Sequence, residues 1–138
     1  VALVEGQLAE KTGKITSWLT EDSRTALVSS SSVDNGGQLA ITNYKVLKEL
    51  ELGLENPESK ISLVELNLET GRTNQIRVHM ASLGHPVVGD RKYGNGNESS
   101  PIDRLCLHAH ILEFIHPMTE KKVRFEAAMP KEFVRVIK

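Results

Sequence analysis

Alternation of apolar and polar residues predicts that most of this chain forms β-strands. Between residues 61 and 70 the side chains of Val64, Leu66 and Leu68 share one parity, which is the two-residue period of a half-buried strand. Residues 40–50 alternate in the same way, although their Lys- and Glu-rich end also allows a helix. Shorter apolar runs indicate further strands at 1–6, 15–19, 25–29, 105–115 and 122–127.

The period changes after residue 71, where a helix is expected. Apolar residues recur there at helical spacing, as Ile76, Met80 and Leu83. Thr73 is placed to cap the start of this helix and Gly84 to end it.

Turn-forming residues separate these segments. Gly, Asn, Ser and Pro cluster in three loops, at 29–38, 53–60 and 94–101, and residues 117–120 predict a hairpin turn. Pro130 suits the first turn of a short terminal helix that carries Phe133 and Ile137. The pattern predicts one mixed α/β domain of the α+β type, with a largely antiparallel sheet and few helices.

Composition fits a soluble globular domain. Of the 138 residues, 39% are apolar and 25% charged. No apolar run reaches the roughly 18–20 residues of a membrane helix, and no signal peptide opens the chain. Cys106 is the only cysteine, which excludes an internal disulfide and favours a reducing, cytoplasmic compartment. The first residue is Val1 rather than Met, so we expect a piece of a longer protein.

Charge is unevenly distributed although the net charge is only −1. Residues 1–70 carry six basic and eleven acidic side chains, whereas residues 71–92 carry four basic side chains and a single acidic one, Asp90. A short basic block in an acidic chain predicts either a local anion site or a solvated charged face.

Several kinds of site are excluded by missing motifs. The chain has no CxxC, HExxH, phosphate-binding glycine loop or nucleophile elbow. His108 and His110 share a strand parity, but no carboxylate or thiolate stands at ligand spacing around them. We therefore expect no metal site.

The informative stretch runs Glu69-Thr-Gly-Arg-Thr-Asn-Gln-Ile-Arg-Val-His79 and continues through Leu83-Gly-His-Pro-Val-Val-Gly-Asp90 to Tyr93-Gly94. It indicates a strand, a glycine turn and a helix whose first turns carry Arg72 and Arg77. Backbone N–H groups at a helix start add positive potential, so this corner suits a carboxylate or a phosphate. By physical reasoning alone a structural salt bridge is the likelier use of the arginines.

This stretch closely resembles the signature of RluA-like pseudouridine synthases. That signature reads Glu-Thr-Gly-Arg-Thr-His-Gln-Ile-Arg-Val-His, followed by Leu-Gly-His-Pro-Val-x-Gly-Asp and a Tyr-Gly. Further resemblance lies in two closing segments and one opening strand, namely Arg104-Leu-Cys-Leu-His-Ala109, Leu112-Glu-Phe-Ile-His-Pro117 and Val1-Ala-Leu-Val-Glu-Gly6. The resemblance implies that residues 1–138 are the C-terminal portion of a pseudouridine synthase catalytic domain, truncated at its N-terminus.

What the family does is then implied as well. Its members convert uridine in RNA, such as rRNA or tRNA, to pseudouridine without a cofactor, and they flip the target base. An aspartate in a His-Arg-Leu-Asp motif initiates the reaction, and an arginine pairs with it. The matching residue here is Arg77, with Ile76, Arg72 and Leu107 as expected substrate-binding residues. A nearby cation favours the ionised carboxylate, and guanidinium also fixes its direction.

Two departures from the family pattern matter. No His-Arg-Leu-Asp occurs in the chain, and the family's nucleophile and its base-stacking tyrosine would both precede Val1. Asn74 stands where the family usually has His. We therefore expect a chain that is inactive alone and binds RNA, with no membrane or metal partner. A sheet edge left open at residues 1–6 would favour self-association.

Two rival interpretations remain. One is a non-catalytic RNA-binding module that keeps the scaffold without the chemistry, and the other is a structural fragment without RNA affinity. A His-Arg-Leu-Asp motif upstream of Val1 would favour the enzyme.

Overall fold

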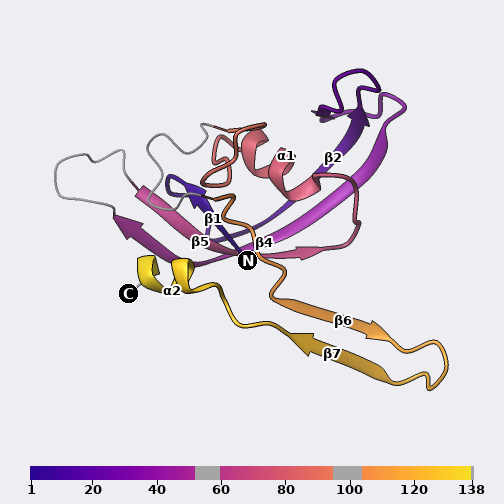
Figure 1. The fold of residues 1–138 in the computed structure, drawn as a ribbon. Coiled ribbons are helices and arrows are strands. Elements are labelled where there is room, and N and C mark those ends of the chain that lie inside the picture. The colour runs from indigo at the N-terminus through magenta and orange to yellow at the C-terminus, as the bar shows by residue number, and fades with distance from the viewer. Residues whose placement is uncertain (52–59, 95–103, 138) are drawn as a thin grey trace.

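An antiparallel five-stranded sheet forms the body of the protein. The computed structural model describes residues 1–51, 60–94 and 104–137. The strand order is β1 (Ala2–Glu5), β5 (Lys60–Leu68), β4 (Gln38–Glu51), β2 (Thr12–Glu21) and β3 (Val28–Ser31). Helix α1 (Gln75–Ser82) lies against this sheet, and a separate hairpin of β6 (Ile111–Ile115) and β7 (Lys122–Glu126) leads to α2 (Lys131–Ile137) (Figure 1). The expected α+β class with a largely antiparallel sheet is confirmed.

The longest strand settles the choice that the sequence left open at residues 40–50. This segment is strand β4, paired with β2 on one side and β5 on the other, so the helical alternative is wrong. A bulge between Val46 and Lys48 shifts the register against β5. Such an extra residue changes the parity of the side chains that follow it, which explains why the apolar alternation breaks near the end of the strand.

Two strand boundaries differ from the prediction because local side chains form turns. The strand expected at 25–29 starts only at Val28, since the Asp22 carboxylate accepts the backbone N–H groups of Arg24 and Thr25 and holds a turn there. The strand expected at 105–115 is shorter, and only Ile111–Ile115 belongs to β6. Of the residues before it, Leu107 forms an isolated bridge with Ala2 of β1 instead.

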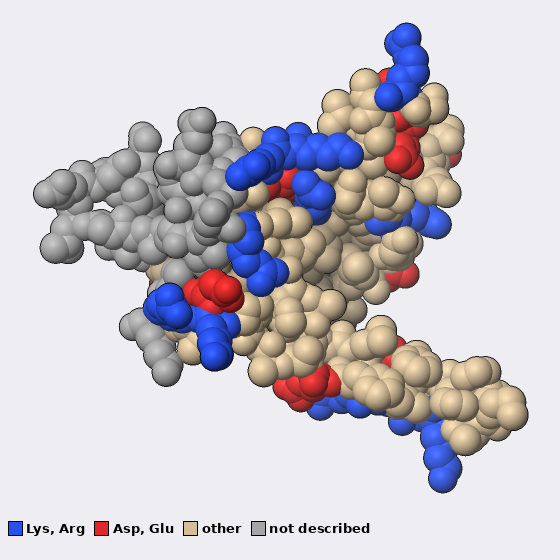
Figure 2. All heavy atoms as spheres, in the orientation of Figure 1, with Lys and Arg blue, Asp and Glu red and all other residues tan. Residues whose placement is uncertain are grey.

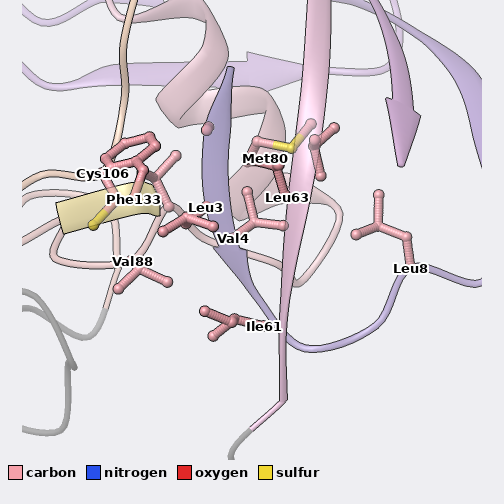
Figure 3. Packing of buried hydrophobic residues seen from close by; sticks show 12 residues of the cluster. Leu3, Val4, Leu8, Ile61, Leu63, Met80, Val88, Cys106 and Phe133 are labelled. Carbon is pink, nitrogen blue, oxygen red and sulfur yellow. The ribbon is translucent and has the colours of Figure 1, made fainter. Parts of the chain in front are cut away.

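A single large apolar cluster lies between β1, β5, α1 and the chain's C-terminal part. Leu3 and Val4 of β1, Met80 of α1 and Phe133 of α2 are fully buried in it (Figure 3). Pro130 directly precedes α2, and its carbonyl accepts the Phe133 N–H at 3.0 Å. The expected short terminal helix is therefore confirmed, with Pro130 just before its first residue, and it closes one side of the core.

The outer side of β1 is covered, so the open sheet edge expected there is wrong. Leu3 donates its N–H to the Cys106 carbonyl at 3.0 Å and accepts from Val88 at 2.8 Å. Isolated bridges join Ala2 to Leu107 and Val4 to Val87. Because these segments satisfy the backbone of the edge strand, β1 offers no free ladder for a second copy of the chain.

The β6–β7 hairpin has one apolar face and one face that mixes charged side chains with Ile111 and Ile115. Leu112, Phe114, Val123 and Phe125 share one parity of the paired strands, and the two phenyl rings stack with centroids 6.1 Å apart. The opposite face carries Glu113 ion-paired to Lys122 at 3.2 Å and to Arg124 at 3.3 Å. Figure 1 shows the hairpin extending away from the sheet, and Leu112, Phe114 and Phe125 of its apolar face are 41–60% exposed.

Three expected loops remain to be compared with the structure. The loop expected at 29–38 is shorter, because residues 29–31 belong to β3 and Gln38 begins β4. The turn at 53–60 and the loop at 94–101 lie outside the described residues, except for Lys60 and Gly94. Neither α1 nor α2 is long and apolar enough to cross a membrane, and the described residues contain no helix that is.

Candidate functional site

The start of α1 is held by a glutamine rather than by the expected threonine cap. Asn74, not Thr73, occupies the N-cap position with a left-handed backbone, φ 55°, and makes no side-chain cap bond. The Gln75 side chain accepts from the Arg72 N–H at 3.0 Å and donates to the Ile41 carbonyl at 2.9 Å. It thereby satisfies a free N–H group before the helix and ties the helix start to β4.

A buried histidine fastens the middle of α1 to the sheet. His79 is fully buried, and its Nε2 and Nδ1 lie 2.8 Å and 2.7 Å from the hydroxyl oxygens of Ser17 and Thr42. Desolvation lowers the pKa of His79 below its ordinary value. A neutral imidazole offers one donor and one acceptor, which matches two hydroxyl partners.

The end of α1 follows the sequence prediction, but its buried face does so only in part. Gly84 ends the helix with φ +85°, and the next N–H, that of His85, bonds the Met80 carbonyl at 2.9 Å. Met80 is fully buried, whereas Leu83 is 40% exposed. The expected apolar stripe therefore stops before Leu83. The buried face of α1 also includes two polar residues, Gln75 and His79.

Arg77 projects from α1 into a two-bonded ion pair with Asp90. Its Nε donates to Oδ2 at 2.9 Å and its Nη2 to Oδ1 at 2.8 Å. The arginine side chain is 21% exposed and the aspartate side chain is fully buried. The carboxylate also accepts the backbone N–H groups of Lys92 and Tyr93, each at 3.0 Å. The structural salt bridge that physical reasoning alone favoured is therefore present, and its carboxylate is that of Asp90.

Mutual stabilisation keeps both members of the pair charged. Burial acts to raise the pKa of Asp90, but the hydrogen bonds from Arg77 and from the Tyr93 N–H outweigh it and hold this pKa below its ordinary value. The hydrogen bond to Asp90 raises the pKa of Arg77. A paired, fully buried carboxylate with four donors cannot reach a substrate, so Asp90 serves to hold Arg77 and does not act as a nucleophile.

Tyr93 touches both members of this pair. Its ring centroid lies 5.2 Å from the Arg77 guanidinium carbon and 5.6 Å from Lys92 Nζ. Its hydroxyl oxygen accepts the Val28 N–H at 3.1 Å and the Asn74 amide at 3.3 Å. The side chain thus connects β3, the N-cap of α1 and the turn that carries Asp90.

The other expected site residues have different surroundings. Ile76 is half-buried and packs on the main core next to Arg77. Arg72 is exposed, and its Nε donates to the Leu39 carbonyl of β4 at 2.9 Å. Leu107 bridges Ala2 at the edge of β1 and packs on the main core. Arg72, Ile76 and Arg77 therefore lie together in α1 and the turn before it, whereas Leu107 lies beside β1.

Sequence reasoning missed Asp90 and Tyr93. Asp90 is a buried partner of Arg77, whereas Asp22 and Asp34 are exposed and accept backbone N–H groups in turns. The signal that could have found Asp90 was its position as the only acid in the basic block. Asp103 lies outside the described residues.

The two histidines just before β6 contact a backbone carbonyl. His108 and His110 lie within 3.3 Å and 2.5 Å of the Ala127 carbonyl oxygen. Within the described residues no three side chains of the His, Cys, Asp and Glu types converge as metal ligands.

The excess positive charge of the basic block lies on the surface. The Arg77–Asp90 pair neutralises itself, whereas Arg72, Arg91 and Lys92 are exposed. Figure 2 shows Lys and Arg side chains lying across the part of the molecule that contains α1. The buried pair is therefore bordered by cations that an anionic ligand could meet.

Comparison with known proteins adds an independent finding. A family described as RNA pseudouridylate synthase matches residues 1–82. The uncharacterized RNA pseudouridine synthase YhcT of Bacillus subtilis (strain 168) is 43% identical over 131 residues, which are 95% of this chain and 40% of the relative. Ribosomal large subunit pseudouridine synthase D of Zymomonas mobilis is 39% identical over 112 residues, covering 76% of this chain and 33% of the relative.

A solved structure shows the same fold. The human protein RNA pseudouridylate synthase domain containing 1 is 31% identical and matches with a TM-score of 0.75. The match covers 94% of this chain and 53% of the human chain. This chain therefore spans about half or less of the length of the relatives described here.

Proposed function

This chain belongs to the RNA pseudouridylate synthase family, of the RluA-like type, and on that premise we propose that the whole protein isomerises uridine to pseudouridine in RNA. The reaction replaces the N1–C1′ glycosidic bond by a C5–C1′ bond and moves one proton, so it needs no oxidant and no cofactor. Residues 1–138 correspond in this proposal to the C-terminal portion of the catalytic domain. Their contribution to the chemistry is Arg77.

One observation carries this proposal, namely that Arg77 is held along one edge only. Asp90 binds Nε and Nη2, and within the described residues Nη1 has no hydrogen-bond partner. The side chain retains 21% exposure, and we place the accessible edge at Nη1. A guanidinium fixed in this way can bind a second carboxylate in a defined direction and keep it ionised. We assign that second position to the aspartate of a His-Arg-Leu-Asp motif.

The 138 residues alone are proposed to be inactive. They contain no His-Arg-Leu-Asp, and the one carboxylate at Arg77 is buried and bound by four donors. Without a free carboxylate at the flipped nucleotide the arginine has no group to orient. Removing one member of a catalytic unit usually costs most of the rate.

RNA is the proposed partner, with the exposed cations Arg72, Arg91 and Lys92 as its phosphate contacts. These side chains lie in the segment that leads into and out of α1, next to the Arg77–Asp90 pair. Ile76 and Leu107, which both pack on the main core, remain proposed substrate contacts. The proposed substrate is uridine in structured RNA, either rRNA or tRNA, and the proposed site of action is the cytoplasm.

The experiment compares this chain with a version extended upstream to include the His-Arg-Leu-Asp motif. Both are incubated with uridine-containing rRNA and tRNA, and pseudouridine is measured by tritium release and mass spectrometry. We expect turnover only from the extended chain, and its loss in that chain on Arg77→Ala. Arg124→Ala is the matched control, because Arg124 is also ion-paired but lies on the hairpin, and it should leave turnover intact.

Three outcomes would contradict the proposal. Turnover by the 138 residues alone would refute the assignment of the nucleophile, and full turnover by Arg77→Ala would refute the role of Arg77. An extended chain that binds RNA without making pseudouridine would instead favour the non-catalytic RNA-binding module.

A further inference from the structure

Tyr93 is the residue through which three separate segments meet at the Arg77–Asp90 pair. Its phenyl ring lies 5.2 Å from the guanidinium carbon, a distance at which a cation is attracted by an aromatic face. Its backbone N–H donates to Asp90 Oδ1 at 3.0 Å. One residue therefore contacts the cation through its ring and the anion through its backbone.

The hydroxyl group of Tyr93 fixes the ring from the opposite end. It accepts a hydrogen bond from the Val28 N–H of β3 at 3.1 Å and one from the Asn74 amide at 3.3 Å. Asn74 is the N-cap of α1, three residues before Arg77. The ring is thus held against both the sheet and the helix that carries the arginine.

Packing alone does not account for this arrangement. Tyr93 is half-buried and borders the small cluster of Leu19, Val28, Ala40 and Val78. A leucine could fill such a position, but it would provide neither a π-face for Arg77 nor an acceptor for Asn74. The Tyr93 hydroxyl bonds Asn74, and the Tyr93 backbone N–H bonds Asp90. Both partners help to determine where the guanidinium lies.

We propose that Tyr93, anchored by Asn74, is a positioning residue that sets the plane of the Arg77 guanidinium and so the direction of its free Nη1. The two hydrogen bonds to Asp90 fix the positions of Nε and Nη2, but they leave the guanidinium plane free to rotate about the line that joins these nitrogens. Contact with the Tyr93 ring removes that rotation. The inference rests on the proposed function of Arg77. It also assigns Asn74 a role, donation of a hydrogen bond to the Tyr93 hydroxyl, that a histidine N–H could perform from the same position.

The test uses the extended chain and separates positioning from stability. Tyr93→Leu removes the π-face and the acceptor, and we expect kcat to fall about 10- to 100-fold with little change in KM, the size typical of a misplaced catalytic group. Val78→Ala is the matched control, because it destabilises the same small cluster without touching the ion pair. It should lower the melting temperature comparably and leave kcat within about twofold.

A conservative series tests the anchor. Asn74→Leu should lower kcat in the same direction as Tyr93→Leu, and Asn74→His should restore it by supplying an N–H donor. In the 138-residue chain, 15N NMR should show the Arg77 Nε–H exchanging faster with water in Tyr93→Leu than in Val78→Ala.

The outcomes separate a failure of this inference from a failure of the proposed role of Arg77. If Arg77→Ala retains turnover, the role of Arg77 itself is wrong. If Arg77→Ala is inactive but Tyr93→Leu behaves like Val78→Ala in both kcat and exchange, Tyr93 is only a packing residue and the inference is overturned.

Discussion

Replacing His79 by leucine should change both the stability of this protein and its dependence on pH. The imidazole is fully buried and bonds the hydroxyl groups of Ser17 and Thr42. Leucine has a similar size but leaves both hydroxyls without that partner, although Thr42 still accepts from the Gln75 amide at 2.9 Å. A buried polar group without a partner costs about 1–3 kcal/mol, so we expect a loss of about 2–4 kcal/mol at neutral pH.

The pH dependence follows from the lowered pKa of His79 in the folded state. In the unfolded chain this histidine binds a proton as the pH falls through about 6.5. The folded protein resists that proton, so protonation stabilises the unfolded state, and the free energy of unfolding decreases by up to about 1.4 kcal/mol per pH unit below this value. The contribution is therefore present above the unfolded pKa and is lost toward acid.

Urea unfolding of the 138-residue chain between about pH 5 and pH 8 measures this effect. The difference between wild type and His79→Leu should shrink as the pH decreases, because only the wild type loses the histidine contribution. His116→Asn, in the hairpin turn, is the control and should keep the wild-type dependence. A difference that stays constant over the whole range would refute the assignment of a buried neutral imidazole.

Two further predictions concern reactivity and local stability. Cys106 is buried and its thiol pKa is raised to about 11, so iodoacetamide at pH 8 should label it only after denaturation; rapid labelling of the native chain would contradict this. Two-stranded hairpins are marginal on their own, so amides of β6 and β7 should exchange with deuterium faster than those of the doubly paired β4; equal protection by mass spectrometry would mean that the hairpin is packed in solution.

Much of the architecture could be predicted from the sequence because strands and turns are local patterns. The alternation at 61–70 and the glycine at position 84 fixed β5 and the end of α1. The run from Glu69 to Gly94 identified the family, since a long match of specific residues does not depend on knowing the fold. It also marked Arg77 as the residue of interest.

Tertiary structure decided what Arg77 contacts. Asp90 and Tyr93 lie 13 and 16 positions further along the chain than Arg77, beyond the reach of a helical period. They meet it only because the turn after Gly89, φ +81°, returns the chain to α1. Tertiary packing likewise placed two polar residues, Gln75 and His79, on the buried face of α1. Periodicity assigns that face to apolar residues, and only the sheet beneath it, with its hydroxyl and carbonyl partners on β2 and β4, makes polar side chains favourable there.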